Sequence, residues 1–378
     1  MSAASRKNLP SLTGLRAPAA FAVFVYHMQW MAPGLRAGGN VAAADLLDRV
    51  ALRGYVGVSF FFILSGFVLT WSRQSRDTAP SFWWRRAVRL YPNHVVTWLL
   101  AAGLIAIGVA ARPPALAGLA NLLLLPHVLV PGAEWTVMND PSWSIEVEAF
   151  FYLLFPALVP GILRSGVPAL RRMAVLMAAI TIGMPLLVVV AGQGSNDGLW
   201  RILYFFPVPR LPEFVLGMAL GMLAARDALP HVDVRLGWFA AAAGLALCTV
   251  APIPFTFAAT TLLPFALLIV AYAQHDRADG PSRLSGRTWV HFGLASYAFY
   301  AFHQLVVRTV EHASGDRSLS LGDAALLTLV SFALALAGAE ALYRLVEHPS
   351  SRFLRNRGPR PRVGRSTPVA EPDVPPAA

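Results

Sequence analysis

The sequence is poor in charged residues and has a single cysteine and a single lysine. Only 13% of its 378 residues are charged, whereas 56% are hydrophobic and the mean hydropathy is +0.55. An ordinary soluble domain is nearer a quarter charged. Cys248 stands alone, so an intrachain disulfide is excluded, and because Lys7 is the only lysine the net charge of +11 comes from arginine. These shortages exclude an ordinary soluble domain and favour an integral membrane protein.

Long apolar runs recur along nearly the whole chain. A helix of about 20 apolar residues crosses the ~30 Å hydrocarbon core of a bilayer. The sequence therefore predicts an all-α, polytopic membrane bundle and not two soluble domains. The apolar segments fall at residues 13–32, 55–72, 93–111, 116–130, 141–163, 172–192, 203–225, 235–251, 256–274, 289–310 and 322–346.

The arginines lie in short loops between these segments, as orientation signals do, and this placement is untypical of nucleic-acid binding. Basic clusters put the N-terminus, the loop at 73–89 and the loop at 164–172 on the cytoplasmic side. Three apolar segments lie between the last two clusters, where only an even number of crossings fits. The weakest is 116–130, so we assign 112–140 to an outer-face loop or re-entrant element.

This scheme gives about ten transmembrane helices with both termini cytoplasmic. The basic start has no clear cleavage site, which favours a retained first span over a signal peptide. Residues 1–351 form the predicted membrane domain, and residues 352–378, which are basic and rich in proline, form a predicted disordered cytoplasmic tail. The sequence contains no phosphate-binding glycine loop, dinucleotide fingerprint or metal-ligand cluster.

Ionisable residues inside the apolar runs mark candidate sites, because each costs roughly 2.5–3.5 kcal/mol at mid-membrane depth. Arg16 and His27 are eleven residues apart in the first span. That spacing returns them to nearly the same helical face, about 16 Å apart along the axis. A shared inward face suits a path from an anionic cytosolic ligand to a buried reaction centre. The alternative is that Arg16 reaches the inner headgroups and His27 caps a carbonyl near the outer boundary.

Two further motifs carry charge. Arg86 and Arg89, at i and i+3, share a helical face, and their planar guanidinium groups suit phosphate oxygens. Basic anchoring beside a membrane span is the alternative reading of this pair. Glu146 and Glu148 are two residues apart in a predicted helix, so they point about 200° apart and at most one faces the same cavity as His27.

Several other polar groups interrupt the later spans. The spacing of Glu340 and Arg344, at i and i+4, predicts a structural ion pair. Arg210, Glu213 and His303 are isolated polar groups to which the sequence gives no definite role.

An ordered set of motifs resembles acyltransferase family 3, a family of membrane acyltransferases. The motifs are "LTGLRAPAAFAVFVYH", "GVSFFFILSGFVLT", "FWWRRAVRLYP", "PSWSIEVEAFFYLLFP", "RLPEFVLGMALG", "SYAFYAFHQ" and "EHP", in that order between residues 9 and 349. Arg16 and His27 match the family's arginine, ten residues, histidine signature. Arg86 and Arg89 match its arginine-x-x-arginine motif. Thr13 stands where the family commonly has aspartate, so that aspartate's role is either weakened here or taken by another group such as Glu146 or Glu148.

The resemblance implies about ten spans in a bacterial cytoplasmic membrane and transfer of an acyl group from acyl-CoA, as co-substrate and with no permanently bound cofactor, to a hydroxyl of a carbohydrate, lipid or small natural product. The form of the fifth span and the lack of an appended esterase-like domain resemble the actinobacterial branch that modifies macrolides and similar metabolites. On this hypothesis Arg16, Arg86 and Arg89 hold the donor's phosphates and His27 is the general base. Glu146 or Glu148 fixes the imidazole tautomer or holds the acceptor.

A transporter or flippase with a relay of His27, Arg16 and Glu146 is the competing hypothesis, and a membrane scaffold without activity is a third.

Overall fold

The computed structural model describes residues 8–73, 77–126, 129–131, 133–190, 197–355 and 357–359, and within these ranges every regular element is helical. The first half comprises α1 (Pro10–Gly14), α2 (Arg16–His27), η1 (Met28–Met31), α3 (Ala32–Ala37), α4 (Val41–Ala51), η2 (Gly54–Val56), α5 (Gly57–Trp71), α6 (Ala79–Ala106), α7 (Ala115–Leu122), α8 (Ser142–Arg164) and α9 (Val167–Val190). The second half comprises α10 (Asp197–Phe205), α11 (Pro207–Ala225), α12 (Val234–Val250), α13 (Ile253–Thr256), α14 (Leu262–Arg277), η4 (Arg283–Ser285), α15 (Arg287–Ser314), α16 (Leu321–Leu342), η5 (Tyr343–Glu347) and α17 (His348–Arg355).

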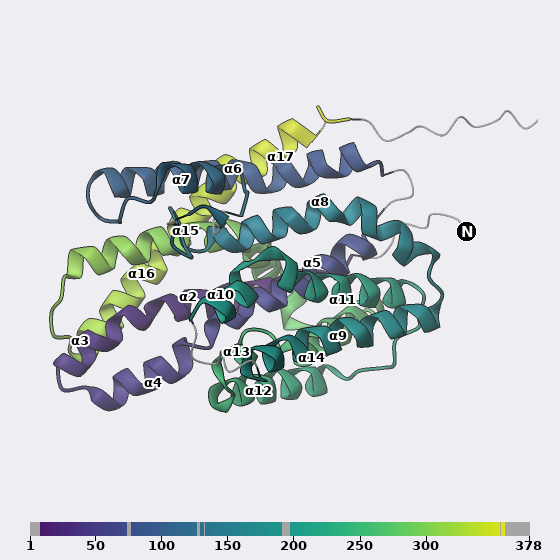
Figure 1. Ribbon diagram of the computed structural model, residues 1–378, viewed down its shortest axis with the longest axis horizontal. Coiled ribbons are helices and arrows are strands. Elements are labelled where there is room, and N and C mark those ends of the chain that lie inside the picture. Colours follow the sequence, from purple (N-terminus) through teal and green to yellow (C-terminus); the bar gives the residue numbers. More distant parts are fainter. Residues whose placement is uncertain are drawn as a thin grey trace, which may run out of the picture.

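The long helices run roughly along one axis of the molecule (Figure 1). Helix α5 lies inside the bundle and packs most extensively against α11, while α15 packs against α2 and α16. Helices α6 and α17 lie together along one edge, and α12 and α14 lie together along the opposite edge (Figure 1). The all-α fold predicted from the apolar runs is confirmed for the described part of the chain.

The outer surface of the bundle is apolar. On α9, the exposed fractions of Val175, Leu187 and Val190 are 70%, 70% and 77%. Large apolar side chains gathered at this density would be a liability in water and are the expected covering of a helix that faces lipid. Within the described ranges, five helical stretches are long and apolar enough to cross a membrane: Val41–Trp71, Ser142–Arg164, Val167–Val190, Pro207–Ala225 and Leu321–Leu354.

Ten of the eleven apolar segments overlap helices of 12 to 28 residues, from α2 with 12 to α6 and α15 with 28 each. The exception is 116–130, in which the only described helix is α7, whose eight residues extend about 12 Å and are too few to cross a bilayer. Its neighbour α6 has 28 residues and begins at Ala79, because the predicted basic helix and the following span form one continuous helix through Pro92.

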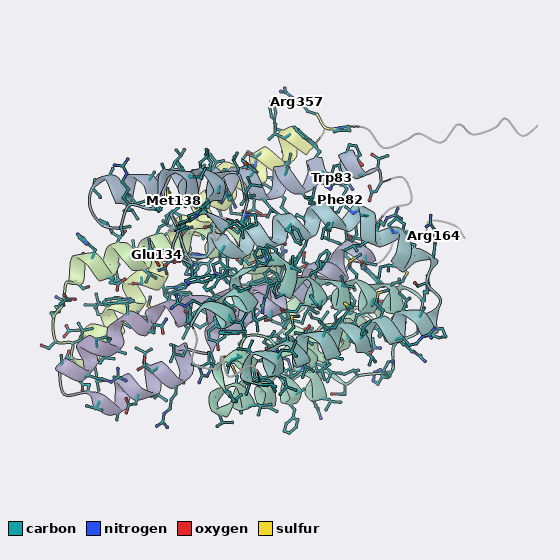
Figure 2. All side chains as sticks on the ribbon, viewed as in Figure 1. Phe82, Trp83, Glu134, Met138, Arg164 and Arg357 are labelled. Carbon is teal, nitrogen blue, oxygen red and sulfur yellow. The ribbon has the colours of Figure 1, made fainter. Side chains whose placement is uncertain are left out.

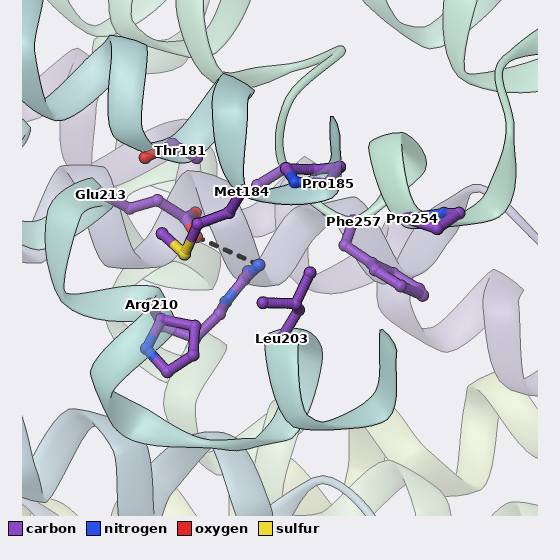
Figure 3. A pocket seen from close by; sticks show the side chains of 10 residues that line it. Thr181, Met184, Pro185, Leu203, Arg210, Glu213, Pro254 and Phe257 are labelled. Atoms are coloured by element: carbon purple, nitrogen blue, oxygen red, sulfur yellow. Dashed lines mark ion pairs between the residues drawn. The ribbon is translucent and has the colours of Figure 1, made fainter. Parts of the chain in front are cut away.

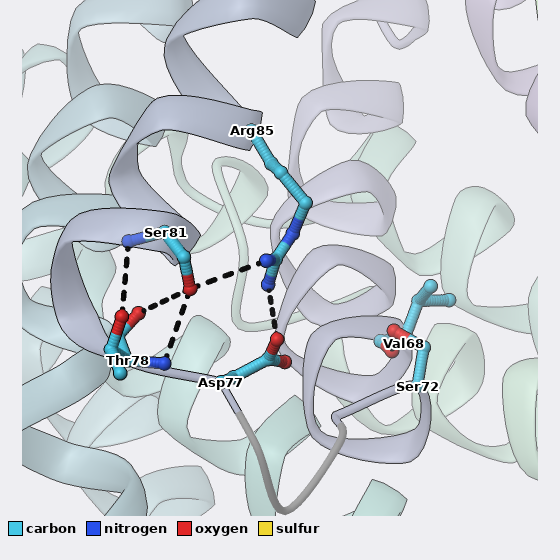
Figure 4. A network of polar contacts seen from close by, with 6 residues as sticks. All are labelled: Val68, Ser72, Asp77, Thr78, Ser81 and Arg85. Carbon is cyan, nitrogen blue, oxygen red and sulfur yellow. Dashed lines mark hydrogen bonds and ion pairs between the residues drawn. The ribbon is translucent and has the colours of Figure 1, made fainter. Parts of the chain in front are cut away.

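Polar contacts fix the beginning of α6 (Figure 4). The Thr78 side chain accepts a hydrogen bond from the Ser81 backbone N–H, and the Ser81 hydroxyl accepts one from the Thr78 N–H, which together form a capping box. Arg85 pairs with Asp77 at 2.7 Å and reaches the Ser81 hydroxyl at 3.4 Å. These two contacts hold the Arg85 side chain at the N-terminus of α6.

The C-terminal helix runs further than the sequence predicts. The predicted tail begins at residue 352, but α17 continues to Arg355. The Trp84 indole N–H donates to the Leu354 carbonyl oxygen at 2.8 Å, so α17 is held against α6. Residues 360–378 of the predicted tail lie outside the described residues.

Glycines allow α5 and α11 to pack at backbone contact. A Cβ atom on Gly217 would lie 2.0 Å from the Ile63 carbonyl oxygen, and one on Gly66 would lie 2.0 Å from the Phe214 carbonyl oxygen. Small residues at a helix–helix contact are the usual route to close packing in membranes, where lipid gives no hydrophobic drive for helices to associate.

We therefore expect Gly217→Ala to destabilise the bundle by about 1–3 kcal/mol, the usual cost of overpacking. The matched control is Gly183→Ala in α9, where the added Cβ would meet no atom within 4 Å. The measurement is the fraction of protein that remains monodisperse after heating in a fixed detergent. Equal survival of the two variants would contradict the close α5–α11 contact.

Candidate active site

Helix α2 begins at Arg16 and ends at His27, so it places these two side chains at opposite ends of one face. Arg16 lies within electrostatic range of Arg89, Glu148 and Glu347. His27 lies within range of His303 and Arg308. Both side chains thus face other helices of the bundle, as their spacing predicts, and not the lipid-facing surface.

The N-terminal end of α2 carries what we call the arginine cluster: Arg16, Arg86, Arg89, Glu148 and Glu347. Glu148 accepts hydrogen bonds from the Ser65 hydroxyl at 3.2 Å and from the Tyr152 hydroxyl. Glu347, which is 6% exposed, accepts one from the Asn93 side-chain amide at 2.7 Å. The two carboxylates are therefore held by neutral donors, while the three cations leave one positive charge in excess.

The guanidinium groups of this cluster are held without direct ion pairs. Within the part of the chain that the structure describes, no ion pair joins Arg16, Arg86 or Arg89 to a carboxylate, and the Nε atoms of Arg16 and Arg86 are buried without a hydrogen-bond partner. Buried cations are normally paired. Because Arg16, Arg86 and Arg89 are partly buried and lack such pairs, together they form a site suited to an anion.

Aromatic side chains support the arginines. The Arg86 Cζ atom lies 5.7 Å from the centroid of the Phe82 ring and 5.9 Å from that of Tyr152, distances typical of cation–π contacts. Phe82 stacks on Phe155 at 4.7 Å, and the Trp83 indole donates to the Tyr152 carbonyl oxygen at 3.1 Å. Phe82 and Trp83 lie toward one end of the molecule and Met138 toward the other (Figure 2).

At the C-terminal end of α2 lies a second group of residues, which we call the histidine end: His27, His303, Gln304, Arg308 and Asp140. The ring centroids of His27 and His303 are 5.1 Å apart. Asp140 accepts from the Gln304 amide at 3.0 Å and pairs with Arg308. This end combines two imidazoles with a paired cation and carboxylate, which is chemistry suited to moving a proton.

The two glutamates proposed for catalysis separate as their spacing predicts. Glu146 is 3% exposed and accepts from the Asn121 amide of α7 at 2.7 Å, whereas Glu148 turns to α5 and the arginines. Because α8 is a regular helix from Ser142, side chains two residues apart point about 200° from each other, and the two carboxylates therefore contact different neighbours. The ring contacts of His27 come from Tyr26 and His303.

Two residues near the site had no assigned role in the sequence. Glu347 reaches the arginines because η5 is a π-helical turn, and such turns are frequent at functional sites. His303 was visible only as a polar residue in an apolar run. A buried imidazole facing His27 follows from the pairing of α15 with α2, which no local pattern reveals.

A second buried polar group lies between α11 and α5. Arg210 and Glu213 form an ion pair at 3.1 Å with exposed side-chain fractions of 2% and 0%, and Arg210 donates to the Ser59 hydroxyl at 2.9 Å. Arg210 and Glu213 border a small cavity of about 20 Å³, room for one water molecule (Figure 3). The pair thus ties α11 to α5. The predicted ion pair of Glu340 and Arg344 is also present, at 2.5 Å.

Comparison with known proteins gives consistent matches over nearly the whole chain. The model of the acyltransferase domain of acyltransferase family 3 matches residues 9–344. The chain is 34% identical to Acyltransferase MdmB of Streptomyces mycarofaciens over 93% of this chain and 94% of that protein. It is 32% identical to the exopolysaccharide production protein ExoZ of Rhizobium meliloti (84% and 95% covered), and 22% identical to O-acetyltransferase OatA of Staphylococcus aureus (91% and 57% covered). No solved structure matches.

Proposed function

The chain belongs to acyltransferase family 3 and is an O-acyltransferase, and on that premise we propose that it transfers a short acyl group from acyl-CoA to a hydroxyl of a carbohydrate, lipid or small natural product. Among its relatives, ExoZ is named for exopolysaccharide production and OatA for O-acetyl transfer. These names support a hydroxyl-bearing acceptor, and a carbohydrate is the first choice. A macrolide-like metabolite, which the resemblance of the fifth span implies, is the second.

The observation that carries the donor assignment is the set of three partly buried arginines without ion pairs. Coenzyme A presents several phosphate oxygens, and the planar fork of arginine binds phosphate in a bidentate way. We propose that Arg16, Arg86 and Arg89 bind these phosphates. Glu148 and Glu347 then keep the guanidinium groups apart and oriented, which is a positioning role.

The distance along α2 suits the donor's length. Arg16 and His27 are eleven residues apart, a rise of about 16 Å. An extended phosphopantetheine arm spans a length of this order. With its phosphates at the arginine cluster, the thioester therefore reaches the histidine end.

His27 is the proposed general base. Its neutral imidazole takes the proton from the acceptor hydroxyl as that oxygen attacks the thioester carbonyl. The tetrahedral intermediate collapses with cleavage of the carbon–sulfur bond. The imidazolium returns its proton to the departing thiolate, so the products are an ester and free coenzyme A thiol.

The proposed topology places these steps across the membrane. With about ten spans and both termini in the cytoplasm of a bacterium, the arginine cluster lies near the cytosolic face, where acyl-CoA is present. The histidine end then lies deeper in the bilayer or near its outer face. Glu146, bound to Asn121, holds the beginning of α8 against α7 at this level.

The test is release of free thiol from acetyl-CoA by the protein reconstituted in liposomes, with and without a mixture of sugar and lipid alcohols. We expect release that depends on both protein and acceptor, and a matching acyl ester by mass spectrometry. A transporter or flippase would instead move substrate across the liposome membrane without releasing thiol. That outcome would reject the proposed function.

A further inference from the structure

Three buried side chains that belong to α15 or bind to it, near the point where α15 faces His27, each present a hydrogen-bond acceptor atom that has no donor. They are His303, Gln304 and Asn139, with exposed fractions of 0%, 5% and 2%. Of the polar side-chain atoms of these three residues, His303 Nε2, Gln304 Oε1 and Asn139 Oδ1 have no hydrogen-bond partner within the described ranges. We propose that these three atoms form a binding site for the hydroxyl groups of a polyhydroxylated, carbohydrate-like acceptor. This inference rests on the proposed function.

The hydrogen-bond partners of each side chain determine which of its acceptor atoms has no donor. His303 Nδ1 lies 3.1 Å from the Phe299 carbonyl oxygen, which can only accept, so the neutral imidazole carries its proton on Nδ1 and leaves Nε2 as an acceptor. Gln304 donates its amide N–H to Asp140 at 3.0 Å. Asn139 donates its own amide N–H to the Ala301 carbonyl oxygen at 2.7 Å.

All three bare atoms therefore have one polarity. A buried acceptor that lacks a donor is costly, and nearly all buried polar groups in native proteins have partners. A hydroxyl donates and meets this demand, whereas a carbonyl or carboxylate group cannot. The nearby Asp140 carboxylate, already bound to Gln304 and Arg308, further disfavours an anionic acceptor.

The site is rigid before any ligand arrives. Asn139 and Asp140 are joined to α15 by their bonds to Ala301, Gln304 and Arg308, and Arg308 also donates to the Met138 carbonyl oxygen at 3.3 Å. The loop before α8 is thus fastened along more than one turn of α15. Pre-organised contacts of this kind lower the ordering cost of binding.

The position relative to His27 connects this site to catalysis. The His27 and His303 ring centroids are 5.1 Å apart. One hydroxyl of a sugar can donate to His303 Nε2 while its neighbour on the same ring reaches His27. The first hydroxyl fixes the molecule, and the second loses its proton to the base. His303 is therefore a residue that selects and positions the acceptor.

Two substitutions of His303 separate the relevant atoms. His303→Asn keeps a donor for the Phe299 carbonyl oxygen and removes the acceptor at Nε2. His303→Gln places an amide oxygen near the Nε2 position and gives up the Nδ1 bond. Gln304→Met removes a second bare acceptor independently, while Asp140 keeps its pairing with Arg308.

Binding is measured by saturation-transfer NMR in lipid nanodiscs, free of glycoside detergents that would compete. The probes are methyl glycosides of glucose, galactose, mannose and N-acetylglucosamine, with cyclohexanol as a single-hydroxyl control. We expect the wild type to bind at least one glycoside and to prefer it to cyclohexanol. The affinity should fall at least tenfold in His303→Asn and Gln304→Met, because each variant lacks an acceptor atom that a ligand hydroxyl would otherwise satisfy. The affinity should stay within about threefold in His303→Gln, which keeps an acceptor near the Nε2 position.

The outcomes distinguish this inference from the proposed function. If no glycoside binds, or if His303→Asn binds as the wild type does, the hydroxyl site is wrong even when acetyl-CoA releases thiol. If the glycoside binds with the expected pattern but no thiol is released, the site stands and the proposed function fails. Monodisperse elution of each variant checks that it has folded.

Discussion

Replacing His27 with alanine is expected to lower kcat for acceptor-dependent thiol release by roughly 10²- to 10⁴-fold, the usual contribution of a positioned general base. The Michaelis constant for acetyl-CoA should change little, because the donor's phosphates are expected at the other end of α2, about 16 Å away. The measurement is initial-rate kinetics in liposomes with a thiol reagent, at several concentrations of donor and acceptor.

The matched control is His312→Ala. His312 is an exposed histidine near the end of α15, outside both the arginine cluster and the histidine end. We expect it to retain the wild-type rate. If His27→Ala kept more than a third of wild-type activity while it folded normally, a general base at His27 would be rejected.

Much of the helical architecture was predictable from the chain itself. Apolar runs of the right length mark α8, α9 and α11 closely, since membrane helices must satisfy their own backbone and be apolar outside. The segment 116–130 was predictable as non-spanning because it is short, contains Pro126 and is followed by a loop-like sequence. The short amphipathic helix α4 (Val41–Ala51) was missed, because a helix stabilised by contacts within the bundle need not have a long apolar pattern.

The site was predictable where it depends on a single helix. Arg16 and His27 share a face because of the helical period, and Glu146 and Glu148 diverge for the same reason. The neighbours of these residues depend on how separate helices rotate against one another. Nothing local in α8 indicates that Glu148 turns toward the arginines, and nothing local in α16 indicates the π-helical turn that brings Glu347 there.

The two ends of α2 divide the proposed work. One end has cations that lack ion pairs, and the other has hydrogen-bond acceptors that lack donors. A phosphate supplies negative charge and a sugar supplies hydroxyl donors, so the opposite demands assign donor and acceptor to opposite ends. His27 lies where the two molecules would meet, which explains why an apolar helix ends in a histidine.

The arginine cluster makes the second large prediction. Arg86→Ala and Arg89→Ala should each raise the Michaelis constant for acetyl-CoA by about 10- to 100-fold, since a hydrogen bond to a charged group contributes ~1.5–3 kcal/mol. The effect on kcat should be smaller, because binding of the phosphates is the same in the ground and transition states. Arg85→Ala is the matched control: Arg85 is paired with Asp77 at the start of α6, and its loss should leave the Michaelis constant unchanged.

A truncated donor separates phosphate binding from a general loss of structure. S-acetylpantetheine carries the thioester but no phosphate, so its Michaelis constant in the wild type should be high. Arg86→Ala and Arg89→Ala should show the same high Michaelis constant for it as the wild type. The ratio of the Michaelis constant for S-acetylpantetheine to that for acetyl-CoA is then much smaller in these two variants than in the wild type. In Arg85→Ala this ratio is unchanged. Equal losses with both donors would show that the arginines hold the bundle together, and their assignment to the donor's phosphates would be wrong.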